Sequence, residues 1–186
     1  MSKNYDKTSI AKQVKLLRWA RKVHKYSGIS LFVFFIIIGF TGLLLTWKKN
    51  SSELIMPETR SIEMASLSKA SSLFDLESKV KNYIDVHSLN TEYSELDKID
   101  IRPTKGIGKF IYKNGDEYQI SLESGQILNY GKRYSDLFEK LHDGSYISDP
   151  FKLFYGTIMS LSLVIFSLTG FWLYLGPKNI KKRKRK

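Results

Sequence analysis

The chain has 186 residues, of which 42% are hydrophobic, and a formal net charge of +12. Residues 1–27 and 178–186 carry +7 each, whereas residues 48–152 carry −2, so the charge favours two membrane-flanking tails over a nucleic-acid-binding surface. Because no cysteine is present, disulfides, thiolate catalysis and cysteine-ligated metal sites are excluded.

Two apolar runs predict two membrane-spanning helices. Ile29–Trp47 and Leu153–Leu175 contain 19 and 23 residues without a charge. They correspond to about 28 and 34 Å of helix, close to the roughly 30 Å core of a bilayer. A cleaved signal peptide is the alternative for the first run, but Thr46–Asn50 contains no small-residue cleavage site.

The basic residues predict the orientation of the chain in the membrane. Fifteen Lys or Arg lie before the first run or after the second. Only three lie next to the runs in the segment between them. Positively charged flanks stay in the cytoplasm, and a basic tail binds anionic lipid. We therefore expect a bacterial inner-membrane protein with both termini in the cytoplasm and the central domain in the periplasm.

The composition divides the chain into six segments. They are a basic amphipathic cytoplasmic segment at 1–27, a transmembrane helix at 28–47, a linker at 48–68, a periplasmic domain at 69–150, a second transmembrane helix at 151–175 and a basic cytoplasmic tail at 176–186. The first segment is expected to lie on the inner leaflet before the chain turns into the bilayer. The predicted fold class is a membrane protein with two transmembrane α-helices and an extracytoplasmic α+β domain.

The periplasmic domain is predicted to place one helix on an antiparallel sheet of three or four strands. The helix covers Ser72–Val86, with Leu73, Leu76, Val80 and Tyr83 on one face, and Ser72 with Asp75 can cap its start. The carboxylates of this domain are expected on a near-neutral surface. The other predicted elements are strands at Lys98–Arg102, Lys109–Lys113, Glu117–Leu122 and Gln126–Tyr130, and a short helix at Tyr134–Leu141.

The turn at Asn114–Asp116 predicts a hairpin register. A three-residue loop over these positions pairs Tyr112 with Tyr118 and Phe110 with Ile120. We favour this loop over a two-residue loop, because it places all four apolar side chains on one face of the sheet.

Small residues form a stripe on each predicted membrane helix. The first stripe is Gly28, Gly39 and Gly42, and the second is Gly156, Ser160, Ser167 and Gly170. An offset of 128 residues aligns Gly28 with Gly156 and Thr41-Gly42 with Thr169-Gly170, which indicates a distant internal duplication. Such stripes allow close packing of two helices, and they also leave space for a flat cofactor. Both interpretations fit the pattern.

Two of the three histidines are candidate haem ligands, because a neutral imidazole beside a small-residue face can bind iron. His24 extends the stripe of the first helix, and His142 precedes the second helix. The alternatives are an interfacial side chain for His24, a helix-end residue for His142 and a surface residue for His87. The 23 residues from His24 to Trp47 place His24 and His142 about 30 Å apart, so a bis-histidine site needs a second copy of the chain.

Several motifs resemble the PepSY-associated transmembrane proteins. They are Arg21–Gly28 before a helix that ends in Thr41–Leu45, Leu141–Gly144 before a helix that carries Leu168–Leu173, and the strand-turn-strand pattern of Asn114–Leu128. The resemblance covers nearly the whole chain. It implies that the outer domain is a PepSY module.

The resemblance also implies a function in iron acquisition, because haem-bearing relatives reduce ferric siderophores. It makes His24 and His142 ligands of haem b, in a homodimer or a larger iron-uptake assembly with ferric reductase-type activity. This chain has only two spans, and Lys152 occupies the position aligned with His24. The alternative is a non-enzymatic, membrane-tethered PepSY binding module that modulates a peptidase or senses the envelope.

Overall fold

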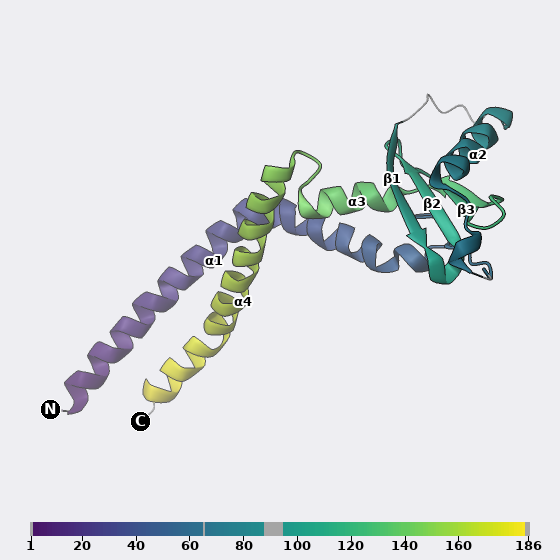
Figure 1. Ribbon diagram of the computed structural model, residues 1–186. Coiled ribbons are helices and arrows are strands. Elements are labelled where there is room, and N and C mark those ends of the chain that lie inside the picture. Colours follow the sequence, from purple (N-terminus) through teal and green to yellow (C-terminus); the bar gives the residue numbers. More distant parts are fainter. Residues whose placement is uncertain (1, 65, 88–94, 185–186) are drawn as a thin grey trace. The chain divides into compact units, whose positions relative to one another are not determined.

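The computed structural model describes residues 2–64, 66–87 and 95–184. The chain forms two compact units, one from residues 1–40 and 141–186 and the other from residues 41–140. Two helices, α1 (Ser2–Trp47) and α4 (Asp149–Lys184), are long and apolar enough to cross a membrane (Figure 1). The protein is thus a membrane protein with two transmembrane helices and an α+β domain, as the sequence predicts.

The first helix is longer than the sequence predicts. We expected a turn between residues 1–27 and the first span, but α1 continues without interruption from Ser2 to Trp47. The reason is a shared face: Leu17 and Ala20 are buried, and the same helical face continues through His24 and Gly28 to contact α4. The expected turn is therefore absent.

Residues 41–140 contain most of the remaining secondary structure. A four-stranded antiparallel sheet has the order β1-β2-β3-β4. The strands are β1 (Leu96–Arg102), β2 (Ile107–Tyr112), β3 (Asp116–Ser121) and β4 (Ile127–Lys132). The helices are α2 (Leu73–Val86), α3 (Tyr134–Asp143) and short 3₁₀ turns at Lys48–Asn50, Leu67–Lys69 and Pro103–Lys105.

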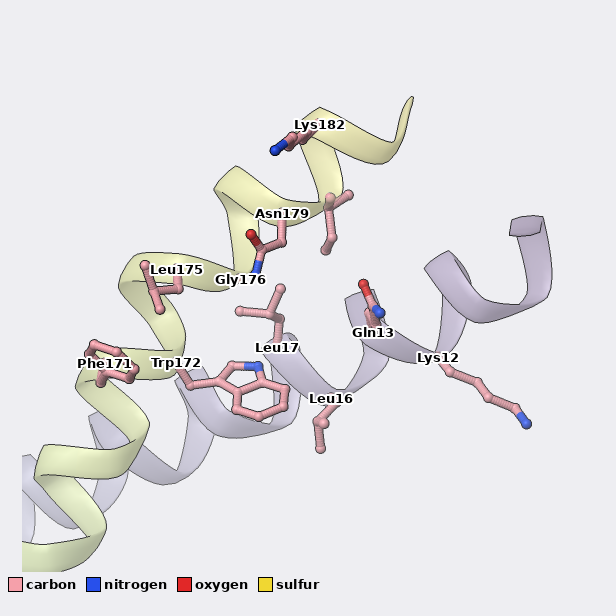
Figure 2. A pocket seen from close by; sticks show the side chains of 11 residues that line it. Lys12, Gln13, Leu16, Leu17, Phe171, Trp172, Leu175, Gly176, Asn179 and Lys182 are labelled. Atoms are coloured by element: carbon pink, nitrogen blue, oxygen red, sulfur yellow. The ribbon is translucent and has the colours of Figure 1, made fainter. Parts of the chain in front are cut away.

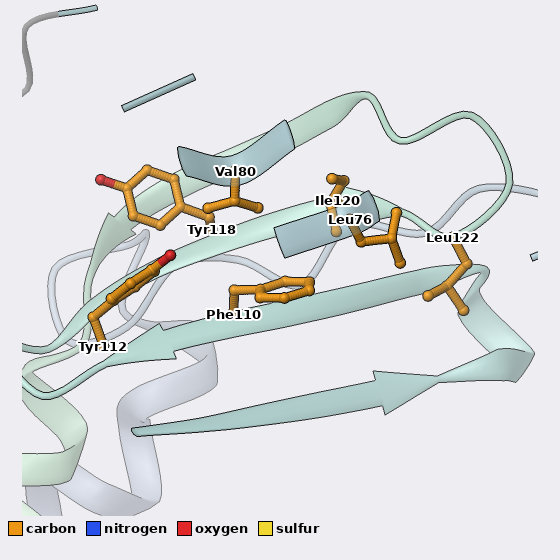
Figure 3. Close-up of a cluster of buried hydrophobic side chains, with 7 residues drawn as sticks. All are labelled: Leu76, Val80, Phe110, Tyr112, Tyr118, Ile120 and Leu122. Atoms are coloured by element: carbon orange, nitrogen blue, oxygen red, sulfur yellow. The ribbon is translucent and has the colours of Figure 1, made fainter. Parts of the chain in front are cut away.

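Helix α2 covers one face of the sheet, and its predicted start is confirmed. The Ser72 hydroxyl accepts a hydrogen bond from the Asp75 backbone N–H at 3.1 Å, which caps the first turn. The fully buried Leu76 and Val80 of α2 then pack on apolar side chains of the sheet (Figure 3). The sheet residues in this core are Phe110, Tyr112, Tyr118, Ile120 and Leu122.

The predicted hairpin register is wrong by two residues. Phe110 pairs with Tyr118, not with Ile120, because the loop covers residues 113–115. Gly115 is the third loop residue and has φ of +87°, the left-handed conformation that three-residue hairpin loops require there. A shift of two residues keeps every side chain on its predicted face. The apolar side chains therefore predicted the buried face correctly but could not predict which residues pair.

The second face of the sheet carries a buried polar cluster, defined here as Lys109, Glu117 and Gln119. All three side chains are fully buried. The Lys109 ammonium and the Gln119 amide donate to Glu117 Oε1 at 2.7 and 2.8 Å, and Arg133 donates to Glu117 Oε2 at 2.6 Å. The prediction that the carboxylates are scattered over the surface is therefore wrong for Glu117.

The segment that we expected as an irregular linker covers this second face. The Thr59 hydroxyl lies 2.8 Å from Lys109 Nζ, and the Arg60 backbone N–H donates to Gln119 Oε1 at 2.9 Å. Gln119 in turn donates to the Glu58 carbonyl at 2.9 Å. Its contacts with the cluster are polar, and its buried apolar side chains, Ile55 and Met56, are adjacent in the sequence. The segment therefore has no apolar period that could reveal its position.

Candidate functional site

The two membrane helices pack against each other in antiparallel directions. Going along α1, Leu17 meets Gly176 of α4, and Gly28 meets Phe166. Further along, Phe34 makes an edge-on ring contact with Tyr155 at 5.9 Å between centroids. Residues further along α1 thus contact residues nearer the start of α4.

His24 lies inside this helix pair. Its Nδ1 is 2.8 Å from the Thr169 hydroxyl, and its ring meets Phe166 edge-on at 4.9 Å. The Thr169 hydroxyl also lies 2.7 Å from the Ile165 carbonyl, which can only accept. If the hydroxyl donates there, it accepts from His24 Nδ1, and the lone pair of the ring is at Nε2. The imidazole is thus oriented by α4, the helix that carries the matching ThrGly pair.

The two small-residue stripes behave differently along their length. A Cβ atom at Gly28 would lie 3.4 Å from the Phe166 ring, and one at Gly170 would lie 3.8 Å from His24. At Gly39 and Gly156, by contrast, a Cβ atom would meet nothing within 4 Å. Close packing therefore applies around Gly28, whereas Gly39 and Gly156 border open space.

That open space belongs to a groove of about 960 Å³, which we call the His142 groove. Its size lies at the upper end of the range that small-molecule and cofactor sites usually show. Its lining is mainly apolar and includes Phe35, Gly39, His142, Gly156, Met159 and Ser160.

The local sequence positions His142 beside α1. Helix α3 ends at Asp143, and Gly144 follows with φ of +81°, as is usual for a residue just after a helix. A Cβ atom at Gly144 would lie only 2.8 Å from Tyr155, so glycine lets the α3–α4 turn approach α4 closely. His142 Nδ1 then lies 3.2 Å from the Ile38 carbonyl.

This hydrogen bond determines which ring nitrogen could bind a metal. A carbonyl only accepts, so His142 Nδ1 carries a proton, and in the neutral ring the lone pair is then at Nε2. Metal-binding histidines typically donate their second N–H to a carbonyl or carboxylate in this way. The His142 side chain has the arrangement that a ligand requires.

An ion pair lies next to His142 in the groove lining. Asp143 Oδ2 is 2.6 Å from Lys152 Nζ, and Asp143 Oδ1 accepts from the Ser145 backbone N–H at 2.9 Å. Partial burial alone would raise the pKa of the Asp143 carboxyl, but these bonds outweigh it and lower that pKa to about 2. The carboxylate is therefore charged at neutral pH and holds Lys152 against the end of α3.

The two candidate histidines are closer together than the sequence predicts. His142 contacts the carbonyl of residue 38, which is 14 residues beyond His24 on the same helix. This corresponds to about 21 Å, not about 30 Å, because His142 lies beside residue 38 of α1 and not beside Trp47 at the end of that helix. The distance still prevents one iron from binding both histidines of a single chain.

The remaining histidine is a surface residue, as predicted. His87 is exposed at the end of α2, where its Nδ1 lies 2.9 Å from the Tyr83 carbonyl and its ring stacks on Tyr83. Among residues 2–64, 66–87 and 95–184, no group of three or more His, Asp or Glu side chains could hold a metal ion. The sequence patterns also missed Asp143, Tyr155 and Met159, because their place in the groove depends on the α3–α4 turn.

The chain matches a known protein family over most of its length. A family model described as the PepSY-associated TM region matches residues 21–186. The match includes both candidate histidines, the four-stranded sheet and both small-residue stripes. No curated protein matches the chain.

Proposed function

Because the chain belongs to the PepSY-associated transmembrane family, whose model covers residues 21–186, we propose that it is a haem-bearing electron-transfer protein of the bacterial inner membrane. In this proposal it assists iron acquisition as a ferric-siderophore reductase-type subunit. Both termini lie in the cytoplasm and the PepSY domain lies in the periplasm. The observation that supports the proposal best is the His142 groove.

The residues of the groove suit haem b. His142 Nε2 would hold the haem, because Nδ1 donates to the Ile38 carbonyl. The open space at Gly39 and Gly156 admits a flat ring, and Phe35 supplies apolar surface. A bound haem would supply a one-electron iron couple.

A second residue that would hold the haem has two sources in this proposal. His142 of a second copy would make the site a homodimer with two histidine ligands, as the spacing of the histidines along the sequence requires. Met159, whose thioether is a ligand type that haem accepts, lines the same groove and would complete the site within one chain. We favour the homodimer, and the Met159→Leu variant distinguishes the two.

The test is the visible spectrum of the full-length protein, expressed in bacteria with a haem precursor and purified in mild detergent. We expect a Soret band whose intensity per protein falls in His142→Ala and is unchanged in His87→Ala, the matched control on the exposed end of α2. The sequence also predicts a haem at His24, which His24→Ala tests by lowering the haem-to-protein ratio. A colourless wild-type protein refutes the haem proposal and leaves the peptidase-modulating or sensing function.

The proposed orientation has a direct test, because the chain contains no cysteine. A single cysteine at Ser68 should react with a membrane-impermeant maleimide in intact spheroplasts. A single cysteine at Thr8 should react only after the membrane is opened. The reverse pattern would overturn the orientation without affecting the haem test.

A further inference from the structure

A second groove lies between the parts of α1 and α4 nearest the two termini, and we call it the terminal groove. It has a volume of about 640 Å³ (Figure 2). In Figure 2, Leu17 and Trp172 lie between the two ribbons, while Lys12 and Lys182 extend from helix segments nearer the chain ends. The lining residues that matter here are Lys12, Leu16, Leu17, Trp172, Leu175 and Lys182.

The floor of the terminal groove is formed by close helix packing. A Cβ atom at Gly176 would lie 2.7 Å from Leu17 Cδ2, so glycine allows this approach. Leu17 is 5% exposed, whereas Leu16 and Trp172 are 45% and 48% exposed. The groove is therefore open and apolar above a tightly packed floor.

The charge around the terminal groove has a single sign. The sequence contains no Asp or Glu between residues 7 and 52 or between residues 150 and 186. Lys12 and Lys182 line the groove, and neither has an acidic neighbour on its own helix within these ranges. An apolar channel with ammonium groups at its edge is complementary to an amphiphile with an anionic head.

We propose that the terminal groove binds one anionic diacyl phospholipid. Its acyl chains lie along Leu16, Trp172 and Leu175, and its phosphodiester lies at the end of the groove that carries Lys12 and Lys182. Trp172 and Leu175 belong to the predicted second membrane span, so the groove borders the lipid, and basic pockets between membrane helices recognise anionic head groups. This inference is independent of haem binding and of the His142 groove.

The test uses Trp172 as a reporter in vesicles. Trp19→Phe and Trp47→Phe leave Trp172 as the single tryptophan of the full-length chain. The protein is reconstituted in phosphatidylcholine that contains either brominated phosphatidylglycerol or brominated phosphatidylcholine at the same mole fraction. We expect the anionic lipid to quench Trp172 more strongly, and excess inorganic phosphate to leave this preference unchanged.

Two matched variants complete the test. Lys12→Gln/Lys182→Gln should lower the preference for the anionic lipid roughly fivefold for each lysine. Lys15→Gln/Lys181→Gln removes the same charge from the same helix ends, outside the groove lining, and should keep most of the preference. Equal quenching by the two lipids, loss of the preference with inorganic phosphate, or equal losses in both double variants would overturn the proposal.

Discussion

Replacing Glu117 with glutamine removes the negative charge at the centre of the buried polar cluster. In the native protein the Glu117 carboxylate accepts hydrogen bonds from Lys109, Gln119 and Arg133 at 2.6–2.8 Å. Burial lowers the pKa of the Lys109 ammonium, and the hydrogen bond and charge of Glu117 oppose this effect. In Glu117→Gln a fully buried ammonium would lose its counterion, and the new amide would present N–H groups to the donors around it.

The expected cost follows from this burial. Removing one partner of a buried ion pair typically destabilises a protein by about 3–5 kcal/mol, because the other charge stays buried without compensation. The Lys109 and Glu117 side chains are both 0% exposed, so solvent cannot replace the lost bond. The double variant Lys109→Met/Glu117→Gln also removes the ammonium, and we expect it to be more stable than Glu117→Gln alone.

Hydrogen–deuterium exchange of the full-length protein in detergent measures this cost at β3. A loss of about 3–5 kcal/mol speeds exchange of the Asp116–Ser121 amides roughly 100- to 5000-fold. Glu95→Gln is the matched control, because Glu95 also lies 2.7 Å from its lysine, Lys113, but on the surface, with 76% of its side chain exposed. Less than about tenfold acceleration in Glu117→Gln, or equal effects in both variants, would refute the reasoning.

Three further predictions concern the cap, the α3–α4 turn and the aromatic core. Ser72→Ala removes the cap of α2 and should cost about 1 kcal/mol, seen as faster exchange in its first turn, whereas Ser78→Ala should not affect that turn. Gly144→Ala should lower the melting temperature in detergent, because the new Cβ would crowd Tyr155 at a positive φ; an unchanged melt contradicts this. Burial raises the pKa of Tyr112 and Tyr118 to about 12. Their stabilising effect is complete below pH 10 and is lost as the pH rises through 12, so ultraviolet titration should show tyrosines that ionise only as the domain unfolds.

The aromatic core of the outer domain was largely predictable from the sequence. The period of Leu76, Val80 and Tyr83 predicted the face of α2, and alternation predicted the buried face of β2 and β3. The polar second face was not predictable, because Lys109, Glu117 and Gln119 have the sequence pattern of exposed strand residues. The covering segment around Thr59 and Arg60, together with Arg133, buries them.

The candidate site was likewise only partly predictable from the sequence. The small residues of both spans were visible in the sequence, where close packing was favoured and a cofactor site remained the alternative. The structure assigns Gly28 to close packing and places Gly39 and Gly156 beside open space. This distinction depends on which residues of α1 contact which residues of α4. The positions of small residues along each helix do not specify those contacts.

By itself the sequence determined the two membrane helices, the α+β domain between them and the three histidines, because hydrophobic length, alternation and residue identity are local properties of the chain. The tertiary structure decided which side chains come together across long separations. It placed His142 beside Ile38, Leu17 against Gly176 and Glu117 between Lys109 and Arg133. Such contacts depend on helix pairing, strand register and the α3–α4 turn, in which a shift of one or two residues changes every partner.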